Sequence, residues 1–485
     1  MKFSVKISLD NSRAISIDEF EIKNNKINFL FGESGIGKTL ISKALLGLLN
    51  SDEFAITIND EPYFQYLENL GVRDMLSKSF YVFQEPSSHL SPVQTLEKQL
   101  NEGKIKNAPD KKLILENLFP SFSKRQLDEF LKIYPKPFRP SGGEKQRVLN
   151  AMAFLAMDKL SFSNAWNALF VFDEPTGHLD AALRNVVLDE VVRMFLKDKP
   201  SVLFITHDYS IVLYIKNKFK NLSEFFHYFE VYVSENKLRQ RRFEPEEYTA
   251  WIASAEKLTR ERNESEMVLS VNSGIKVFDN VLYFTEKGKE TDLKLRKGET
   301  VYLKAPSGTG KTTLAKILLG FLPARFNAKI CGEQISGETP KRIYSEKIRG
   351  KKITVAFQHA EEALNENATV AETFDALGDF DFENLRETFF EFFGEPYENF
   401  ARKKIKNLSG GQKQKINLLR TLALNACVTI LDEPLNGMDL QSAQAVLSVL
   451  KNRMQSGQSF LLISHNEDIF DKIAERTVRL TAATP

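Results

Sequence analysis

Residues 27–39 read INFLFGESGIGKT, and this stretch decides the fold. The apolar run 27–31 predicts a buried strand, and the glycines that follow predict a tight turn into a helix over 38–49. Consecutive backbone N–H groups in such a turn, together with the positive end of the helix, form a cradle for an anion. The stretch therefore predicts a strand, a phosphate-binding loop and a helix.

The same pattern returns at residues 300–312, which read TVYLKAPSGTGKT, with Ala305 in place of the first loop glycine. We expect Lys38 and Lys311 to reach the outer phosphates of a nucleotide, and Thr39 and Thr312 to offer hydroxyls to Mg²⁺. The predicted phosphate-loop residues are Gly32, Glu33, Ser34, Gly35, Ile36, Gly37, Lys38 and Thr39, and Ala305, Pro306, Ser307, Gly308, Thr309, Gly310, Lys311, Thr312 and Thr313.

Four further motifs recur in the same order and at nearly the same offset. They are Gln84 and Gln358, Ser141–Glu144 and Ser409–Gln412, Asp173-Glu174 and Asp432-Glu433, and His207 and His465. Repetition of a whole ordered set indicates a duplicated domain. We expect the first domain to span 1–255, with a tail to about residue 266, and the second to span 267–485.

Apolar runs alternate with helical segments in both copies, which predicts an α/β fold with a mostly parallel sheet. The runs 169–172 and 428–431 end on Asp-Glu, and the runs 202–206 and 460–464 end on His. Ligands of such sheets bind at the carboxyl ends of the strands. All these side chains are therefore expected at the phosphate loops.

Each of these polar residues has an expected role in ATP hydrolysis. Glu174 and Glu433 are the candidate bases that polarise the attacking water, and His207 and His465 are expected to position it. A carboxylate at the end of a strand can hold the hydration shell of Mg²⁺. The predicted Mg²⁺ ligands are Thr39, Gln84, Asp173, Thr312, Gln358 and Asp432.

Composition narrows the class of protein. The formal net charge of the 485 residues is +2, which provides no bulk electrostatic attraction to nucleic acid. No apolar run approaches the length of a membrane span, and alternation over 1–13 predicts an edge strand rather than a signal peptide. Cys331 and Cys427 stand at no metal-like spacing, so we expect no disulfide, zinc site or iron–sulfur cluster, in keeping with a reducing cytoplasm.

The ordered motifs, with Asp180 and Asp439 after the acidic pairs, resemble those of the ABC ATPases over nearly the whole chain. The resemblance implies two tandem P-loop NTPase domains, each with a parallel core, an antiparallel β subdomain and a helical subdomain. It also implies that ATP lies between the phosphate loop of one domain and the Ser-Gly-Gly signature of the other. The implied signature residues are Ser141, Gly142, Gly143 and Glu144, and Ser409, Gly410, Gly411 and Gln412.

Several positions depart from the family pattern. Pro140 and Glu144 replace the usual leucine and glutamine of the signature, and the residues before Asp180 lack the usual Ser-Ala. Residues 11–13 offer no aromatic ring for adenine, whereas Tyr283 or Phe284 could stack on it in the second copy. We therefore expect two competent but inequivalent ATP sites.

Three segments resemble the oligopeptide, dipeptide and nickel importer ATPases. They read FGESGIGKT, YVFQEPSSHLSPVQTLEKQL and NKLRQRRFEPEEYTAWIASA. This resemblance implies peptide or small-solute uptake through two integral membrane permease subunits at the cytoplasmic face of the membrane, with an extracytoplasmic solute-binding protein as an indirect partner. The permeases are expected to dock around residues 84–92 and 358–366.

Two alternative functions remain open from the sequence. A fused sugar-importer ATPase has about this length, but that class predicts a degenerate second site, and both acid pairs are kept here. A twin-cassette ATPase acting on the ribosome predicts a long charged linker, and residues 208–266 include charged stretches. A DNA-repair ATPase is disfavoured because the chain has no zinc-type cysteine pairs.

Overall fold

The computed structural model describes the chain except for residues 10–12, 103–110, 137–138, 161–166, 178, 235–236, 260–265, 307, 359, 379 and 484–485. It divides into two compact units, Met1–Thr249 and Ala250–Pro485. The division falls within α11 (Pro245–Ser254), and Trp251 and Leu258 pack on the core of the second unit. The units and the predicted domains thus differ at residues 250–255, and the domain limits stay a prediction.

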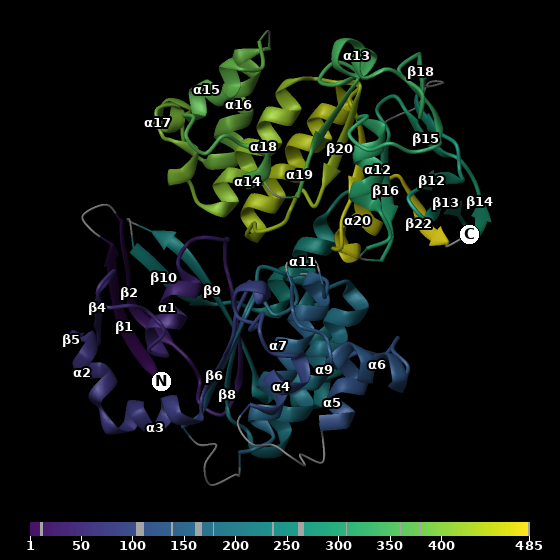
Figure 1. Ribbon diagram of the computed structural model, residues 1–485. Helices are drawn as coiled ribbons and strands as arrows, with labels where there is room; N and C mark the ends of the chain where they lie inside the picture. Colours follow the sequence, from purple (N-terminus) through teal and green to yellow (C-terminus); the bar gives the residue numbers. More distant parts are fainter. Residues whose placement is uncertain are drawn as a thin grey trace. The chain divides into compact units, whose positions relative to one another are not determined.

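The first unit is built on a parallel group of five strands (Figure 1). Their order is β9 (Phe226–Ser234), β3 (Ile27–Phe31), β8 (Ser201–Ile205), β7 (Leu169–Asp173) and β6 (Phe80–Val82). Every residue of β3, β7 and β8 is buried, as expected for central strands covered on both faces. The expected parallel core is confirmed.

An antiparallel region continues this sheet. It comprises β1 (Lys2–Leu9), β2 (Arg13–Glu21), β4 (Ala55–Ile58), β5 (Glu61–Pro62) and β10 (Lys237–Arg242). The prediction that the N-terminal strand is an edge strand was wrong, because β4 pairs with the side of β1 that β2 leaves open.

Helices pack around the strands of the first unit (Figure 1). Buried residues of α1 (Lys38–Leu45), α2 (Tyr63–Glu68) and α3 (Leu70–Lys78) share one hydrophobic core cluster with residues of β1 and β3. The helical region contains α4 (Leu96–Asn101), α5 (Lys111–Leu118), α6 (Lys124–Leu131) and α7 (Gly142–Met157). α7 contacts β6 and also α9 (Ala181–Asp198), while α10 (Ser210–Lys218) follows β8.

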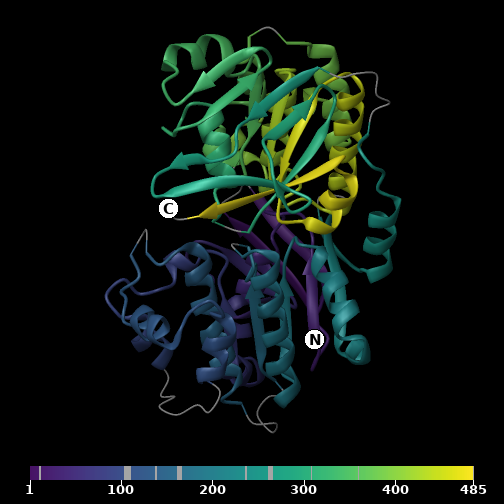
Figure 2. The same ribbon diagram turned by 90° about the vertical axis from the view of Figure 1, so that its right-hand side faces the viewer.

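The second unit repeats this plan with its antiparallel strands split between two sheets. The larger sheet has the order β12 (Ile275–Val277), β13 (Asn280–Glu286), β22 (Arg476–Ala483), β16 (Thr300–Lys304), β21 (Ser459–Ile463), β20 (Val428–Asp432) and β19 (Ile353–Ala356), and β14 (Lys289–Glu290) pairs with β13. Strands β22 to β19 are parallel, and Figure 2 shows the strands of this sheet side by side, coloured teal to yellow.

The smaller sheet is antiparallel, with the order β15 (Leu293–Arg296), β11 (Met267–Val271), β17 (Asn327–Ile330) and β18 (Glu333–Ser336). The helices of this unit are α12 (Lys311–Leu318), α13 (Lys341–Ile343), α14 (Ala360–Ala363), α15 (Val370–Asp375), α16 (Phe382–Phe393), α17 (Glu398–Ala401), α18 (Gly410–Ala423), α19 (Leu440–Gln455) and α20 (Glu467–Ile473). The parallel core, antiparallel region and helical region of the expected fold class are therefore present.

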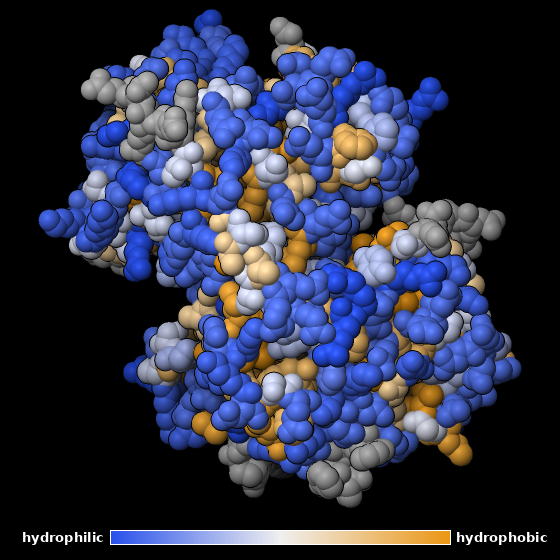
Figure 3. Space-filling view, turned by 180° about the vertical axis from the view of Figure 1, so that it is seen from behind, coloured by the Kyte–Doolittle hydropathy of each residue, from blue (hydrophilic) through white to orange (hydrophobic). Residues whose placement is uncertain are grey.

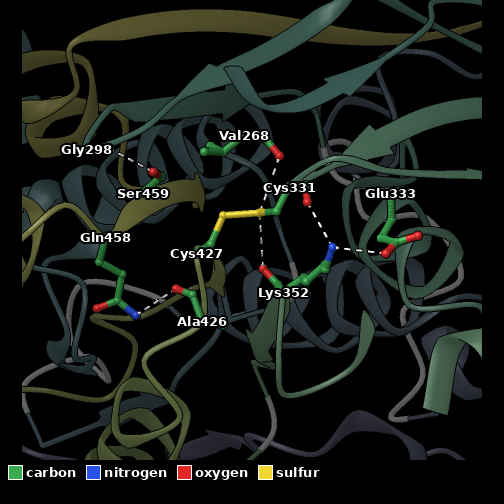
Figure 4. The surroundings of a disulfide bond; sticks show 9 residues. All are labelled: Val268, Gly298, Cys331, Glu333, Lys352, Ala426, Cys427, Gln458 and Ser459. Carbon is green, nitrogen blue, oxygen red and sulfur yellow. Dashed lines mark hydrogen bonds and ion pairs between the residues drawn. A yellow bond between two sulfur atoms is a disulfide. The ribbon is translucent and has the colours of Figure 1, made fainter. Parts of the chain in front are cut away.

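A disulfide joins the two sheets of the second unit (Figure 4). Cys331 lies in the turn between β17 and β18, and Cys427 directly precedes β20. Lys352 secures the same turn, because its Nζ donates a hydrogen bond to the Cys331 carbonyl oxygen at 2.9 Å and pairs with Glu333. The prediction of no disulfide was wrong: the cysteines are 96 residues apart in sequence, and only the packing of the two sheets brings them together.

In the described parts of the chain, no helix combines the length and the apolar character needed to cross a bilayer. The face drawn in Figure 3 is mainly hydrophilic, with hydrophobic side chains scattered among the polar ones.

Candidate functional site

The phosphate-loop lysines adopt the same position in both units. Lys38 is buried, and its Nζ donates to the carbonyl oxygens of Gly32 at 2.6 Å and Glu33 at 2.8 Å. Lys311 donates in the same way to Ala305 at 2.6 Å and Pro306 at 3.3 Å. The loop backbone therefore holds each ammonium group at the start of α1 or α12, where it can meet a phosphate.

The substitution of Ala305 for glycine has a clear structural basis. Gly32 has a φ of 139°, and a Cβ there would lie 2.3 Å from the carbonyl oxygen of Val231 in β9. Ala305 lies outside this left-handed region of φ. The second loop thus accommodates a side chain where the first requires glycine, and it still directs its lysine in the same way.

A hydroxyl and a carboxylate meet beside each loop. Thr39 Oγ1 donates to Asp173 Oδ1 at 3.2 Å, and Thr312 Oγ1 donates to Asp432 Oδ2 at 2.6 Å. Both carboxylates are buried at the end of a central strand, β7 or β20. Hard oxygen donors of this kind suit Mg²⁺, which takes one or two protein ligands and keeps several waters. The donor chemistry fits that ion.

The glutamates that follow these aspartates are held in an uncommon backbone conformation. Glu174 has a φ of 48° and Glu433 a φ of 53°. Their N–H groups donate to the carbonyl oxygens of Ile205 at 3.0 Å and Ile463 at 2.8 Å, at the ends of β8 and β21. Non-glycine residues at positive φ persist where surrounding structure fixes them, often at functional sites.

In the first unit the glutamate contacts its histidine directly. His207 Nδ1 lies 2.8 Å from Glu174 Oε1, within hydrogen-bonding distance. Burial by itself lowers the pKa of His207, but the charge of Glu174 and the hydrogen bond to it outweigh that effect and raise the pKa. Glu174 and His207 therefore form a coupled pair at the carboxyl ends of β7 and β8.

In the second unit a serine holds the glutamate. His465 Nε2 lies 3.7 Å from Glu433 Oε1, beyond hydrogen-bonding distance. Ser464 Oγ instead donates to Glu433 Oε2 at 2.7 Å. The threonine at the matching place, Thr206, accepts a hydrogen bond from the backbone N–H of Asp208.

Two of the buried carboxyls have raised pKa values. Burial raises the pKa of Glu433 to about 7, against the hydrogen bond from Ser464. Burial likewise raises the pKa of Asp173 to about 6, against the hydrogen bond from Tyr81. Raised carboxyl pKa values at the ends of sheet strands are typical of functional sites.

The Ser-Gly-Gly segments form the beginnings of α7 and α18. Ser141 Oγ accepts from the N–H of Glu144 at 3.3 Å, and a Glu144 carboxylate oxygen accepts from the N–H of Ser141 at 2.8 Å. Ser409 and Gln412 make the same reciprocal pair. Glutamate and glutamine serve equally in this capping box, which explains why Glu144 is tolerated.

The remaining predicted site residues lie on loops or helix ends. Asp180 and Asp439 cap α9 and α19 by accepting hydrogen bonds from Leu183 N at 2.9 Å and Ser442 N at 2.7 Å. Gln84 is exposed just after β6, and Gln358 is half-buried just after β19. Ser307 lies outside the described residues.

The expected adenine-stacking residues of the second unit differ in exposure. The suggestion that Phe284 could stack on adenine was wrong, because its side chain is fully buried in the core of the second unit. Side chains alternate between the two faces of β13, and Phe284 lies on the face that points into the core. Tyr283 is half-buried, so its predicted role stays open. Sequence reasoning missed Ile15 and Leu282, which stand beside the last loop glycines, Gly37 and Gly310, in the two units.

Sequence reasoning also missed Tyr81 and Ser42 in the first site. Tyr81 OH donates to Asp173 Oδ2 at 2.8 Å and lies 3.0 Å from Ser42 Oγ. Tyr81 belongs to the quoted YVFQEP segment, but no spacing rule links it to an aspartate 92 residues away. The parallel pairing of β6 with β7 makes the contact.

Comparison with known proteins identifies the family. The family described as "ABC transporter" matches residues 16–177 and 289–436. The peptidoglycan transport ATP-binding protein YejF of Agrobacterium fabrum is 25% identical, with 97% of this chain and 88% of that protein covered. The glutathione import ATP-binding protein GsiA of Shigella boydii is 24% identical, covering 94% of this chain and 80% of that protein.

A solved structure shares the two-unit fold. The archaeal ribosome recycling factor aABCE1, in complex with the stalk protein aP1, aligns with a TM-score of 0.63 and 18% identity over 98% of this chain and 89% of that chain. At this identity the likeness shows the fold alone. The family match and the two P-loop sites lead to one conclusion: the chain belongs to the ABC transporter family and carries two ATP-hydrolysing cassettes in tandem.

Proposed function

We propose that the chain is the ATP-binding subunit of an importer that takes up peptides or a related small solute through separate membrane permease subunits. Relatives that align over nearly the whole chain bear the names of a peptidoglycan transporter and a glutathione importer. A putative peptide import protein of Brucella abortus is 30% identical over 40% of the chain. The cargoes in these names, peptidoglycan, glutathione and peptides, all contain amino-acid residues, which supports a peptide-containing solute.

One observation carries the proposal for both units: each gathers a lysine, a threonine, an aspartate, a glutamate and a histidine at the carboxyl ends of its central strands. The second set is as complete as the first, with Lys311, Thr312, Asp432, Glu433 and His465. This completeness of the second set disfavours the sugar-importer alternative, which predicts a degenerate second site.

Mg²⁺ bound to ATP would neutralise phosphate charge beside the Thr39–Asp173 and Thr312–Asp432 pairs, with Gln84 and Gln358 as further proposed ligands. Lys38 and Lys311 bind the outer phosphates, and the loop N–H groups complete the cradle. These residues orient the γ-phosphate toward Glu174 and Glu433.

Hydrolysis follows from the position of the two glutamates. Glu174 or Glu433 accepts a proton from water as the water oxygen bonds to the γ-phosphorus and the bond to the β-phosphate oxygen breaks. His207 fixes Glu174 through the 2.8 Å contact, and Ser464 fixes Glu433. Both histidines can then donate a hydrogen bond to the γ-phosphate.

We also propose that the cassettes share their sites head to tail. Residues 32–39 would work with Ser409–Gln412, and residues 305–312 with Ser141–Glu144. Both signatures begin a helix, with Ser141 and Ser409 as its N-cap, and the positive end of such a helix supports anion binding there. ATP would then hold the cassettes together, and hydrolysis would release them.

The partners would be two integral membrane permeases on the cytoplasmic face, docking near residues 84–92 and 358–366. The test is purification of the tagged full chain from detergent-solubilised membranes and, in parallel, its sedimentation in a sucrose gradient. Two multispanning subunits in equal ratio with the chain are the expected result. Sedimentation with ribosomal subunits, without membrane partners, would instead support the ribosomal alternative.

A further inference from the structure

Tyr81 and Ser42 form a hydroxyl pair behind the carboxylate of Asp173. Tyr81 is 7% exposed and Ser42 fully buried, and their oxygens lie 3.0 Å apart. Tyr81 OH also lies 2.8 Å from Asp173 Oδ2, while Ser42 Oγ donates to the Thr39 carbonyl oxygen at 3.0 Å. The phenol thus connects the phosphate-loop helix α1 to the end of β7.

The available protons determine which group donates in each hydrogen bond of this cluster. An ionised carboxylate only accepts, so the single proton of Tyr81 points to Asp173 Oδ2. Thr39 donates to the other oxygen, Oδ1, at 3.2 Å. Each oxygen of Asp173 therefore has its own hydroxyl donor, and rotation of the carboxylate would break both bonds.

The second unit lacks both members of this pair at the same places in the fold. Tyr81 pairs with Val171, two residues before Asp173, and Val355 pairs with Ile430, two residues before Asp432. Ser42 is four residues after Lys38, and Ala315 stands four residues after Lys311. Valine and alanine side chains donate no hydrogen bond, so the phenol–serine arrangement belongs to the first unit.

We propose that Tyr81 is a positioning residue for the metal-binding carboxylate of the first cassette and makes its magnesium affinity differ from that of the second. The inference rests on the proposed role of Asp173 at Mg²⁺. Tyr81 donates to Oδ2 and thereby fixes the orientation of the carboxylate, so that Asp173 would meet a bound metal in one defined position. Hydrogen-bond partners that orient a metal ligand typically change metal affinity about 10- to 100-fold when removed.

The experiment counts bound Mn²⁺ on the full chain with a non-hydrolysable ATP analogue, from the EPR signal of free Mn²⁺. Tyr81→Phe removes only the hydroxyl, and we expect one of two Mn²⁺ sites to weaken about 10-fold while the other is unchanged. Tyr66→Phe is the matched control, because Tyr66 is equally buried in the same unit and donates to the Leu45 carbonyl oxygen at 2.9 Å. Loss of the Tyr66 hydroxyl should leave both Mn²⁺ affinities unchanged.

Unchanged or tighter Mn²⁺ binding in Tyr81→Phe overturns the proposal. An Asp173→Asn arm separates the causes: loss of one Mn²⁺ site there, with no shift in Tyr81→Phe, refutes only the role of Tyr81. No effect of Asp173→Asn refutes the magnesium role of Asp173 and the inference together. If Tyr81→Phe does not fold, the double variant Val355→Tyr with Ala315→Ser tests the same idea by introducing the hydroxyl pair into the second unit. The inference then requires tighter Mn²⁺ binding in the second unit.

Discussion

The two cassettes hold the same glutamate in different ways. In the first, His207 Nδ1 lies 2.8 Å from Glu174 Oε1. In the second, His465 Nε2 is 3.7 Å from Glu433 Oε1, and Ser464 Oγ donates a hydrogen bond to Glu433 Oε2 at 2.7 Å. The aspartates differ as well, because Tyr81 donates to Asp173 and Val355 stands at the matching position. The backbone of both glutamates is nevertheless the same, with φ near 50° and an N–H bonded to the neighbouring strand.

This comparison separates what the reaction requires from what can vary. The strand ends, the loop lysine and the threonine–aspartate contact are conserved between the copies in this chain. The groups that hold the carboxylates are not. We therefore expect both sites to hydrolyse ATP, with different sensitivity to the residues around the base.

The largest expected effect comes from the bases themselves. Glu174→Gln and Glu433→Gln should each slow hydrolysis at their own site by about 10²- to 10⁴-fold, because glutamine cannot accept the proton. Phosphate release and trapped ATP measure the loss, and Glu338→Gln, at an exposed position of the second unit, is the control. Full turnover in both single variants would refute the base assignment.

The disulfide lies in the second cassette, so its removal should lower the stability of the second cassette and leave that of the first unchanged. Replacing Cys331 and Cys427 by serine should destabilise the second unit by about 2–4 kcal/mol without reductant, because the link closes a long loop of the unfolded chain. Unfolding followed by tryptophan fluorescence, with and without dithiothreitol, measures the difference. Equal stability of the oxidised chain and the serine variant would contradict this, as would two free thiols before reduction.

The loop lysines should behave alike, in spite of Ala305. Lys38→Ala and Lys311→Ala should each weaken nucleotide binding at one site by about 10- to 100-fold, since each removes a charged donor to phosphate. Titration with a fluorescent ATP analogue reports both sites, with Lys341→Ala as a control at an exposed lysine. Unchanged affinity in Lys311→Ala would mean that the second site does not bind nucleotide.

The smallest expected effects test how each base is held. With the other base inactivated, His207→Ala should slow the first site about 10-fold, and Ser464→Ala should slow the second by a similar factor, because each removes a hydrogen bond that positions the base. Thr206→Val, the counterpart of Ser464→Ala, should leave turnover unchanged. If Thr206→Val and Ser464→Ala slow hydrolysis by the same factor in single-turnover assays, the two glutamates are not held differently, and this prediction is wrong.

The parts that follow local patterns were predictable. The apolar runs before Gly32, Asp173 and His207 became buried parallel strands, because a strand covered on both faces must be apolar throughout. The phosphate-loop helices began at the lysines as expected, but the first ended at Leu45, four residues before the predicted end at residue 49. Helix ends depend on local capping and packing more than on periodicity.

The parts that arise from long-range pairing were not predictable. Tyr81 reaches Asp173 only through the register of β6 with β7, and Cys331 reaches Cys427 only because two sheets pack together. Likewise, Phe284 and Tyr283 are neighbours in sequence, yet only the alternation along β13 decides that Phe284 points into the core. A single sequence without register information cannot supply these contacts.

The central claim is that the two cassettes close on ATP head to tail. Spin labels placed beside the first phosphate loop, at Leu40, and beside the second signature, at Lys406, would report the distance between them by pulsed EPR in the chain that carries Glu174→Gln and Glu433→Gln. The account predicts that ATP shortens this distance and narrows its distribution, and that ADP does not. A distance that is the same with ATP, with ADP and without nucleotide would contradict it.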